Sequence, residues 1–139
     1  MSWIWLDGVN HFEKGKSVQA FKFWKNDYPL PFLIEMVAQA SGLLVGAESN
    51  FEEDIVFTKI EGMEFLKQPK QGKLEIAVES DGIRREGGWF SGQIFQDGSK
   101  IMHGRVLLMN VGRLRPDGKG PITFPQQLMS GLKLKTALA

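Results

Sequence analysis

Two polar side chains interrupt the longest apolar stretch of the chain, residues 30–47, and they are the first candidates for chemistry. Glu35 and Gln39 stand four residues apart, so in a helix they lie one turn apart on the same face. Burial among apolar residues raises the pKa of a carboxyl group, which would suit Glu35 to general acid or base catalysis near neutral pH. Gln39 could orient Glu35 or hydrogen-bond a substrate carbonyl. Alternatively, Glu35 accepts hydrogen bonds at a helix N-terminus and Gln39 satisfies strand backbone.

Four other residues have side chains that could take part in catalysis. Tyr28, the only tyrosine, follows Asp27 just before the apolar stretch, and its phenol could donate a proton or hold a carbonyl. Both residues also fit a turn or a packing role. The only histidines are His11 and His103. We expect His11 in a surface strand or turn and His103 half-exposed on a strand.

The composition excludes several kinds of site. The chain has no cysteine, which rules out disulfides, thiolate nucleophiles and cysteine-based zinc sites. Two histidines are too few for a histidine-rich metal site. We therefore predict neither a metal nor a cofactor. Lys and Arg number 17 against 16 Asp and Glu, and this balance gives no electrostatic footprint for nucleic acid.

The length and the distribution of charge indicate one domain with a basic tail. The 139 residues are 42% hydrophobic, enough for one domain with its own core. Residues 113–139 carry a net charge of +4, so the first 112 residues sum to −3. We predict a folded domain over residues 1–112 and a peripheral basic tail over residues 113–139.

The chain is predicted to be soluble and cytoplasmic, with no membrane span. Its N-terminus lacks the basic and apolar regions of a signal peptide. The apolar stretch contains Glu35, and a carboxylate facing lipid would be costly. A helix buried inside a soluble domain is the better interpretation.

The first part of the sequence predicts two strands and a helix. Residues 3–6, with a possible continuation to Val9, and residues 17–24 favour strands. Two prolines then interrupt regular structure, and the second, Pro31, suits the first turn of a helix. A helix is predicted over residues 32–47.

The second part predicts four strands joined as an antiparallel meander, with Val56 and Ile60 on one face of the first. Leu74, Ile76 and Val78 alternate with polar residues, which indicates a half-buried strand. The pairs Gly87-Gly88 and Asp97-Gly98 are typical of two-residue hairpin turns. They flank a strand over residues 89–96, and the final strand is expected over residues 101–111.

The predicted helix is apolar nearly all round, which indicates burial on every side. A sheet has to wrap around it. One sheet of this size is not expected to cover such a helix alone, so we predict a homodimer.

Residues 32–42, Phe-Leu-Ile-Glu-Met-Val-Ala-Gln-Ala-Ser-Gly, resemble the central helix of the 3-hydroxyacyl-acyl-carrier-protein dehydratases. Residues 56–74 resemble the next strand and loop of that family. Residues 88–100 resemble its central hairpin, and residues 106–109 its last strand. The resemblance covers roughly residues 3–112.

This resemblance implies an α+β hotdog fold, an antiparallel sheet wrapped around one buried helix. It further implies acyl thioesters of acyl carrier protein or coenzyme A as substrates, in fatty-acid or related lipid metabolism. The assembly would be a homodimer, a dimer of dimers or a trimer of dimers. In that family the carboxyl group equivalent to Glu35 helps expel water from the 3-hydroxyacyl chain, while a histidine removes the α-proton.

The chain departs from the family just before the helix. A His-Phe-Pro-Gly stretch stands there in the family, but residues 21–29 contain no histidine. The family glycine, whose N–H polarises the thioester carbonyl, corresponds to Leu30, which still offers an N–H. The residue types and the resemblance together give Glu35 as the catalytic candidate and Tyr28, Leu30 and Gln39 as substrate-binding candidates.

Three functions remain open from the sequence. The chain could be a dehydratase, hence a lyase, with an altered active site. It could be a thioesterase that uses Glu35. It could also be a non-catalytic hotdog protein that binds acyl carrier protein or lipid, with Arg84, Arg85 and the basic tail steering an acidic carrier.

Overall fold

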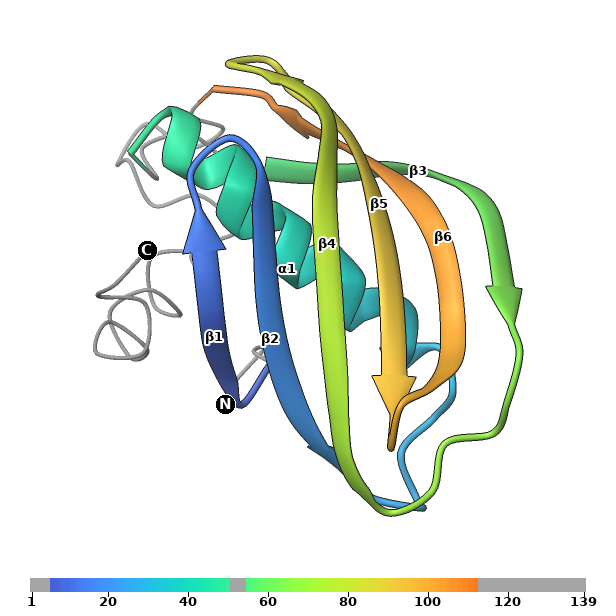
Figure 1. Ribbon diagram of the computed structural model, residues 1–139. Coiled ribbons are helices and arrows are strands. Elements are labelled where there is room, and N and C mark those ends of the chain that lie inside the picture. The colour runs from blue at the N-terminus through green and yellow to red at the C-terminus, as the bar shows by residue number, and fades with distance from the viewer. Residues whose placement is uncertain (1–5, 51–54, 113–139) are drawn as a thin grey trace.

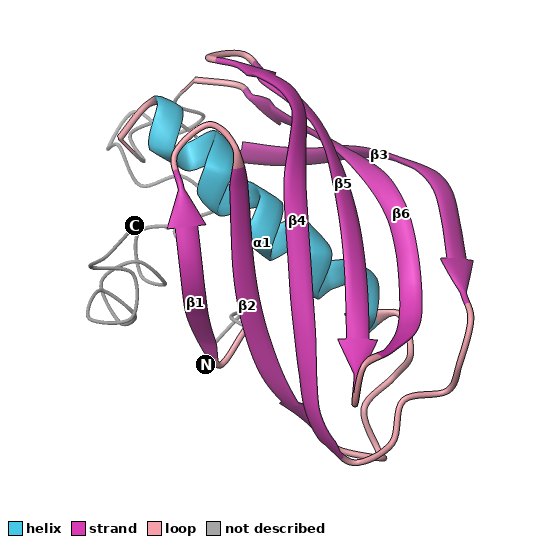
Figure 2. Ribbon diagram, in the orientation of Figure 1, coloured by secondary structure: helices cyan, strands magenta, loops and turns pink. Residues whose placement is uncertain are grey.

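A computed structural model describes residues 6–50 and 55–112. The predicted tail lies outside these residues, as does most of the first predicted strand. These residues form one helix and a single sheet (Figure 2). In chain order the elements are β1 (Gly8–Glu13), β2 (Ser17–Trp24), α1 (Phe32–Glu48), β3 (Ile55–Phe65), β4 (Gly72–Arg84), β5 (Gly87–Gln96) and β6 (Ser99–Asn110).

The local predictions near the helix are confirmed. Strand β2 has the predicted bounds, and α1 begins at Phe32, directly after Pro31, and ends at Glu48. Pro31 is the N-cap residue and makes no side-chain capping hydrogen bond. The first described strand starts at Gly8, and the predicted start at residue 3 lies outside the described residues.

One of the two predicted hairpin turns is confirmed and the other is wrong. Asp97 and Gly98, with φ of 51° and 79°, join β5 to β6, as the favoured two-residue turn requires. In the other hairpin, residues 85–86 form the turn, and Gly87 already belongs to β5. A Cβ atom on Gly87 would collide with the carbonyl oxygen of Leu108. This glycine therefore allows close backbone approach instead of forming the turn.

The strands form one antiparallel sheet in the order β1-β2-β4-β5-β6-β3. The predicted four-strand meander is therefore wrong, because β3 pairs with β6 at the far edge and not with β4. Figure 1 shows the sheet curving around α1, with β1 and β3 at opposite edges. Alternation within a strand shows which residues face the core, but it does not specify the neighbouring strand.

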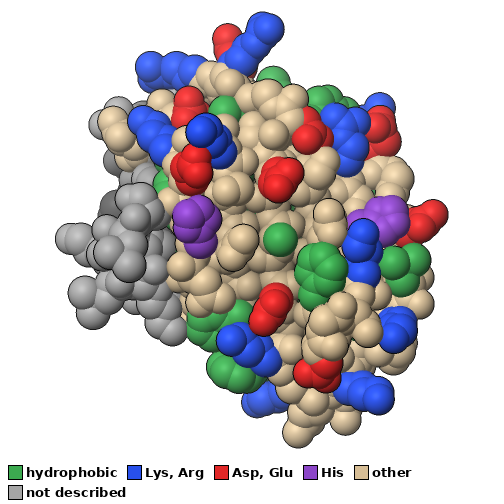
Figure 3. Space-filling model, viewed as in Figure 1, with side chains coloured by type: hydrophobic (Ala, Val, Ile, Leu, Met, Phe, Trp, Pro, Cys, Tyr) green, Lys and Arg blue, Asp and Glu red, His purple; other side chains and the backbone are tan. Residues whose placement is uncertain are grey.

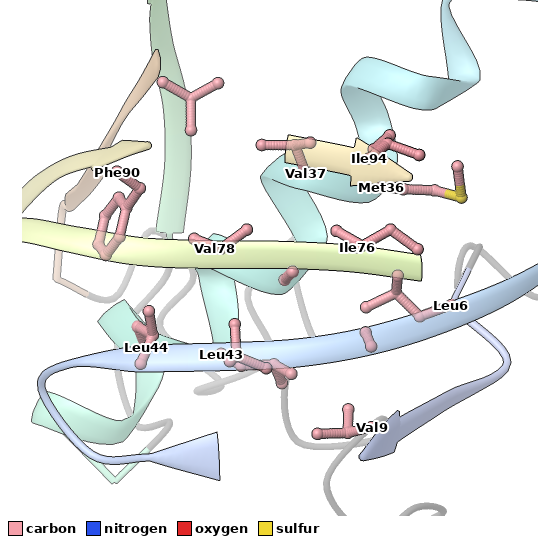
Figure 4. Close-up of a cluster of buried hydrophobic side chains, with 14 of the residues drawn as sticks. Leu6, Val9, Met36, Val37, Leu43, Leu44, Ile76, Val78, Phe90 and Ile94 are labelled. Carbon is pink, nitrogen blue, oxygen red and sulfur yellow. The ribbon is translucent and has the colours of Figure 1, made fainter. Parts of the chain in front are cut away.

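The core lies between α1 and the concave face of the sheet. Leu74, Ile76 and Val78 are each at most 1% exposed, as their alternation predicted, and Figure 4 shows two of them facing helix side chains. Every α1 residue from Met36 to Gly46 is buried within one chain. The predicted enclosure is confirmed for this part of the helix, whereas Glu35 is exposed and both ends of α1 are only partly buried.

The edge strand β3 is irregular, and its faces were predicted incorrectly. Val56 pairs with Met109, a half-buried residue, whereas Ile60 pairs with the buried Val106. A register shift at residues 57–59 separates the two pairs, so Val56 and Ile60 lie on opposite faces of the sheet. Within the described ranges, no helix has the length and apolar character needed to cross a membrane.

Candidate functional site

Glu35 lies in the first turn of α1 and is exposed. The burial expected from the sequence is therefore wrong for a single chain, although Leu33 in the same turn is fully buried. A carboxylate at this place is favoured by the positive end of the helix dipole. Glu35 is thus a charged group that a ligand or a second chain can reach, next to a buried apolar core.

Gln39, one turn further along the helix, is hydrogen-bonded to Glu35. Its side chain is 1% exposed, and its Nε2 donates a hydrogen bond of 3.4 Å to Oε1 of Glu35. The predicted pairing of these two residues on one helix face is confirmed. Their roles in catalysis and substrate binding stay predictions.

The loop before α1 places Tyr28 and Leu30 against the core. Both are partly buried, and the Tyr28 ring meets Trp24 edge-on, with 5.2 Å between centroids. Asp27 is exposed in the same loop. The Leu30 carbonyl accepts the Leu33 N–H at 3.0 Å, while for the Leu30 N–H no backbone acceptor is found among residues 6–50 and 55–112. Leu30 directly precedes Pro31, the N-cap residue of α1.

A buried lysine next to this loop was missed by the sequence analysis. Lys22 is 8% exposed, and its Nζ lies 3.3 Å from Oδ1 of Asp7 and 5.5 Å from the centroid of the Tyr28 ring. The other oxygen of Asp7 accepts the Phe23 N–H at 2.6 Å. The cluster ties the start of β1 and the end of β2 to the loop that leads into α1. The alternation of β2 could have revealed it, because Lys22 falls in the inward series Val18, Ala20, Lys22, Trp24.

Neither histidine lies near the start of α1. Both are visible on the face of the sheet turned away from the helix (Figure 3). His11 is exposed on β1, and His103 is 38% exposed with its Nε2 3.1 Å from Oε2 of Glu64, in line with their expected surface positions. In the described part of the chain, no three His, Asp or Glu residues group together as a metal site would need. Glu35 therefore has no histidine partner within the chain.

A second polar cluster lies on the outer face of the sheet. Arg105 donates hydrogen bonds to Asp81 at 3.0 Å and to Glu61 at 2.7 Å, and its guanidinium lies 4.7 Å from the centroid of the Trp89 ring. The hydrogen bond to Asp81, followed by the one to Glu61, raises the pKa of Arg105 above its ordinary value. Because its carboxylates come from β4 and β3, this cluster ties the edge strand to the sheet.

Comparison with solved structures identifies the fold of the chain. No protein-family model and no curated protein matches the chain. Among solved structures, the dehydratase heterocomplex ApeI:P from Xenorhabdus doucetiae matches with a TM-score of 0.64 and 21% identity. That match covers 77% of this chain and 82% of the other.

Two further matching structures contain acetyl-CoA or coenzyme A. The protein smu.793 from Streptococcus mutans, bound to acetyl-CoA, has a TM-score of 0.65 and 17% identity over 83% of this chain and 95% of its own. A hypothetical thioesterase protein from Streptococcus pneumoniae, with coenzyme A, has a TM-score of 0.59 and 20% identity over 77% and 96%. Together with the topology, these matches show that the chain has the hotdog fold.

Proposed function

We propose that the chain hydrolyses acyl thioesters, with Glu35 as the catalytic residue. The observation that carries the proposal is the hydrogen bond between the exposed Glu35 and the buried Gln39 at the start of α1, where the Leu30 N–H has no backbone acceptor among the described residues. Hydrolysis needs one general base, a polarised carbonyl and water. Dehydration needs a second acid–base group, and no histidine stands near Glu35 to supply it.

In the proposed reaction, the Leu30 N–H and the start of α1 bind the thioester carbonyl oxygen and stabilise the charge that develops on it. The Glu35 carboxylate accepts a proton from water, whose oxygen attacks the carbonyl carbon. The tetrahedral intermediate then collapses with cleavage of the C–S bond. The departing thiolate takes the proton from Glu35, so that a carboxylic acid and a thiol are released and Glu35 is regenerated.

Dehydration of a 3-hydroxyacyl thioester is the second candidate. It is supported by the likeness of residues 32–42 to the dehydratase helix and by the structural match to a dehydratase heterocomplex. In this reaction Glu35 would protonate the leaving hydroxyl group. Tyr28 is the residue of the adjoining loop that could assist.

The working assembly that we propose is a homodimer, with coenzyme A or acyl carrier protein carrying the substrate. Strand β3 leaves one edge of the sheet unpaired, and such edges favour pairing with another chain. A second copy next to Glu35 would exclude water and strengthen electrostatic interactions there. The cytoplasmic location, the place in fatty-acid metabolism and any higher assembly stay predictions.

The test is the substitution Glu35→Gln, which keeps the shape of the side chain and removes its ability to accept a proton. Turnover of acyl-CoA should fall by roughly 10²–10⁴-fold, while circular dichroism and the unfolding midpoint stay close to those of the parent. Glu48→Gln, the same change at the other end of α1, is the matched control and should keep activity. Equal turnover by Glu35→Gln and the parent would refute the role of Glu35.

A further inference from the structure

Side chains from two different elements fill the space in front of two facing glycines on the inner side of the sheet. Gly92 of β5 pairs with Gly104 of β6. A Cβ atom on Gly92 would lie 2.5 Å from Cγ1 of Val37, and one on Gly104 would lie 2.6 Å from Sδ of Met63. At this level the helix touches the sheet directly, and Met63 occupies the space beside it.

A bulge in β3 turns Met63 inward. The register of β3 against β6 shifts between Glu61 and Glu64, and Gly62 has a φ of +60°. Bulges of this kind redirect a side chain and are structural features in their own right. Both glutamates are held on the outer face by hydrogen bonds to β6 side chains. Hydrogen bonds on the outer face of the sheet therefore fix the bulge, while Met63 packs on the inner face.

Met63 is flanked by exposed apolar side chains of the same strand. Ile60 is 42% and Phe65 is 43% exposed, although their partners on β6, Val106 and Met102, are buried core residues. The arrowhead of β3 lies at the same end of the molecule as the start of α1 (Figure 1). An apolar surface thus leads from this end, where the thioester carbonyl would bind, to Met63.

We propose that Met63 determines which acyl groups the site accepts, by standing in the path of an acyl chain that lies along this apolar surface, between Phe65 and Ile60. This inference rests on the proposed function. Acyl groups that reach Met63 are bound, and longer ones meet its thioether. Because a methionine side chain is flexible and unbranched, its truncation to Ala would free the volume of Cγ, Sδ and Cε without moving the backbone.

The experiment is calorimetric titration of the full chain with non-hydrolysable thioether analogues of acyl-CoA, in a series from acetyl to dodecyl. For the parent, affinity should stop rising at a short chain length. For Met63→Ala the rise should continue over about two more methylenes at about fourfold each, so the longer analogues bind at least tenfold more tightly. Met109→Ala, on the outer face of β6, is the matched control and should reproduce the parent profile.

Each result decides the proposal. A parent that binds the series and a Met63→Ala variant with an unchanged profile would overturn the role of Met63 and leave the proposed function standing. If no analogue binds the parent, both the role of Met63 and the proposed function are refuted. If Met63→Ala changes the sedimentation of the chain together with its binding profile, the altered profile reflects assembly, and the role of Met63 in chain length is overturned. Should Met63→Ala fail to fold, Met63→Val removes less volume and should extend the profile by a smaller step.

Discussion

Glu35 and Gln39 illustrate what residue type and spacing can predict and what they cannot. Their four-residue spacing correctly placed them on one helix face, where they are hydrogen-bonded. The exposure of Glu35 was wrongly predicted, because it depends on which side of the first helical turn the rest of the fold covers, and Leu33 is buried there while Glu35 is not. Lys22 was missed for a related reason, since a lysine within a strand is usually solvated and its partner Asp7 lies 15 residues away.

The first prediction concerns the buried charge of Lys22. Asp7→Asn keeps the shape of its partner and removes the negative charge, which leaves Lys22 without full compensation. Because the Asp7 side chain is 35% exposed, we expect a loss of about 1–3 kcal/mol in the free energy of unfolding, below the range for fully buried pairs. Urea unfolding measures it.

Glu13→Gln is the control for this prediction. The ion pair of Glu13 with Lys16 is largely exposed, and surface pairs contribute little to stability. Equal effects of the two substitutions would show that the Lys22–Asp7 pair is no more important than a surface pair.

At the scale of elements, local patterns were predictive and long-range pairing was not. The bounds of α1 and β2 and the Asp97-Gly98 turn follow from prolines, apolar periodicity and turn chemistry within a few residues. The pairing of β3 with β6 does not follow from such local patterns, because it joins two segments that are far apart in the sequence. The bulge at residues 57–59 also breaks the alternation from which its faces were predicted.

The second prediction concerns the contact between α1 and β5. Gly92→Ala would place a methyl group 2.5 Å from Cγ1 of Val37, and such overpacking costs about 1–3 kcal/mol. Val37→Ala in the same chain should relieve the collision, so the double variant should lose less stability than the two single variants summed. Additive losses, measured by urea unfolding, would show that the two residues do not compete for this space.

At the scale of the whole molecule, one chain buries the middle of its helix and leaves β3 at an edge of its sheet. The helix is buried from Met36 to Gly46, so this part does not require a second copy to cover it. Among the described residues, β3 pairs on one side only, and its exposed apolar residues Ile60 and Phe65 are the remaining reason to expect a second copy.

The third prediction is a dimer with about twice the 15.6 kDa mass of one chain in sedimentation at micromolar concentration. Ile60→Lys should weaken it, because a charge on the inner face of β3 would have to be desolvated on association. Val56→Lys, on the outer face of the same strand, should leave the dimer intact. A monomer of the parent at this concentration would contradict the prediction.

Product analysis distinguishes hydrolysis of acyl thioesters, the function proposed for this hotdog chain, from dehydration. The purified chain would be incubated with butyryl-CoA and with 3-hydroxybutyryl-CoA, and free thiol and enoyl product would be measured separately. We predict release of thiol from butyryl-CoA and its loss in Glu35→Gln. Enoyl product without thiol release would establish the dehydratase instead, and binding of the thioesters without any product would contradict catalysis altogether.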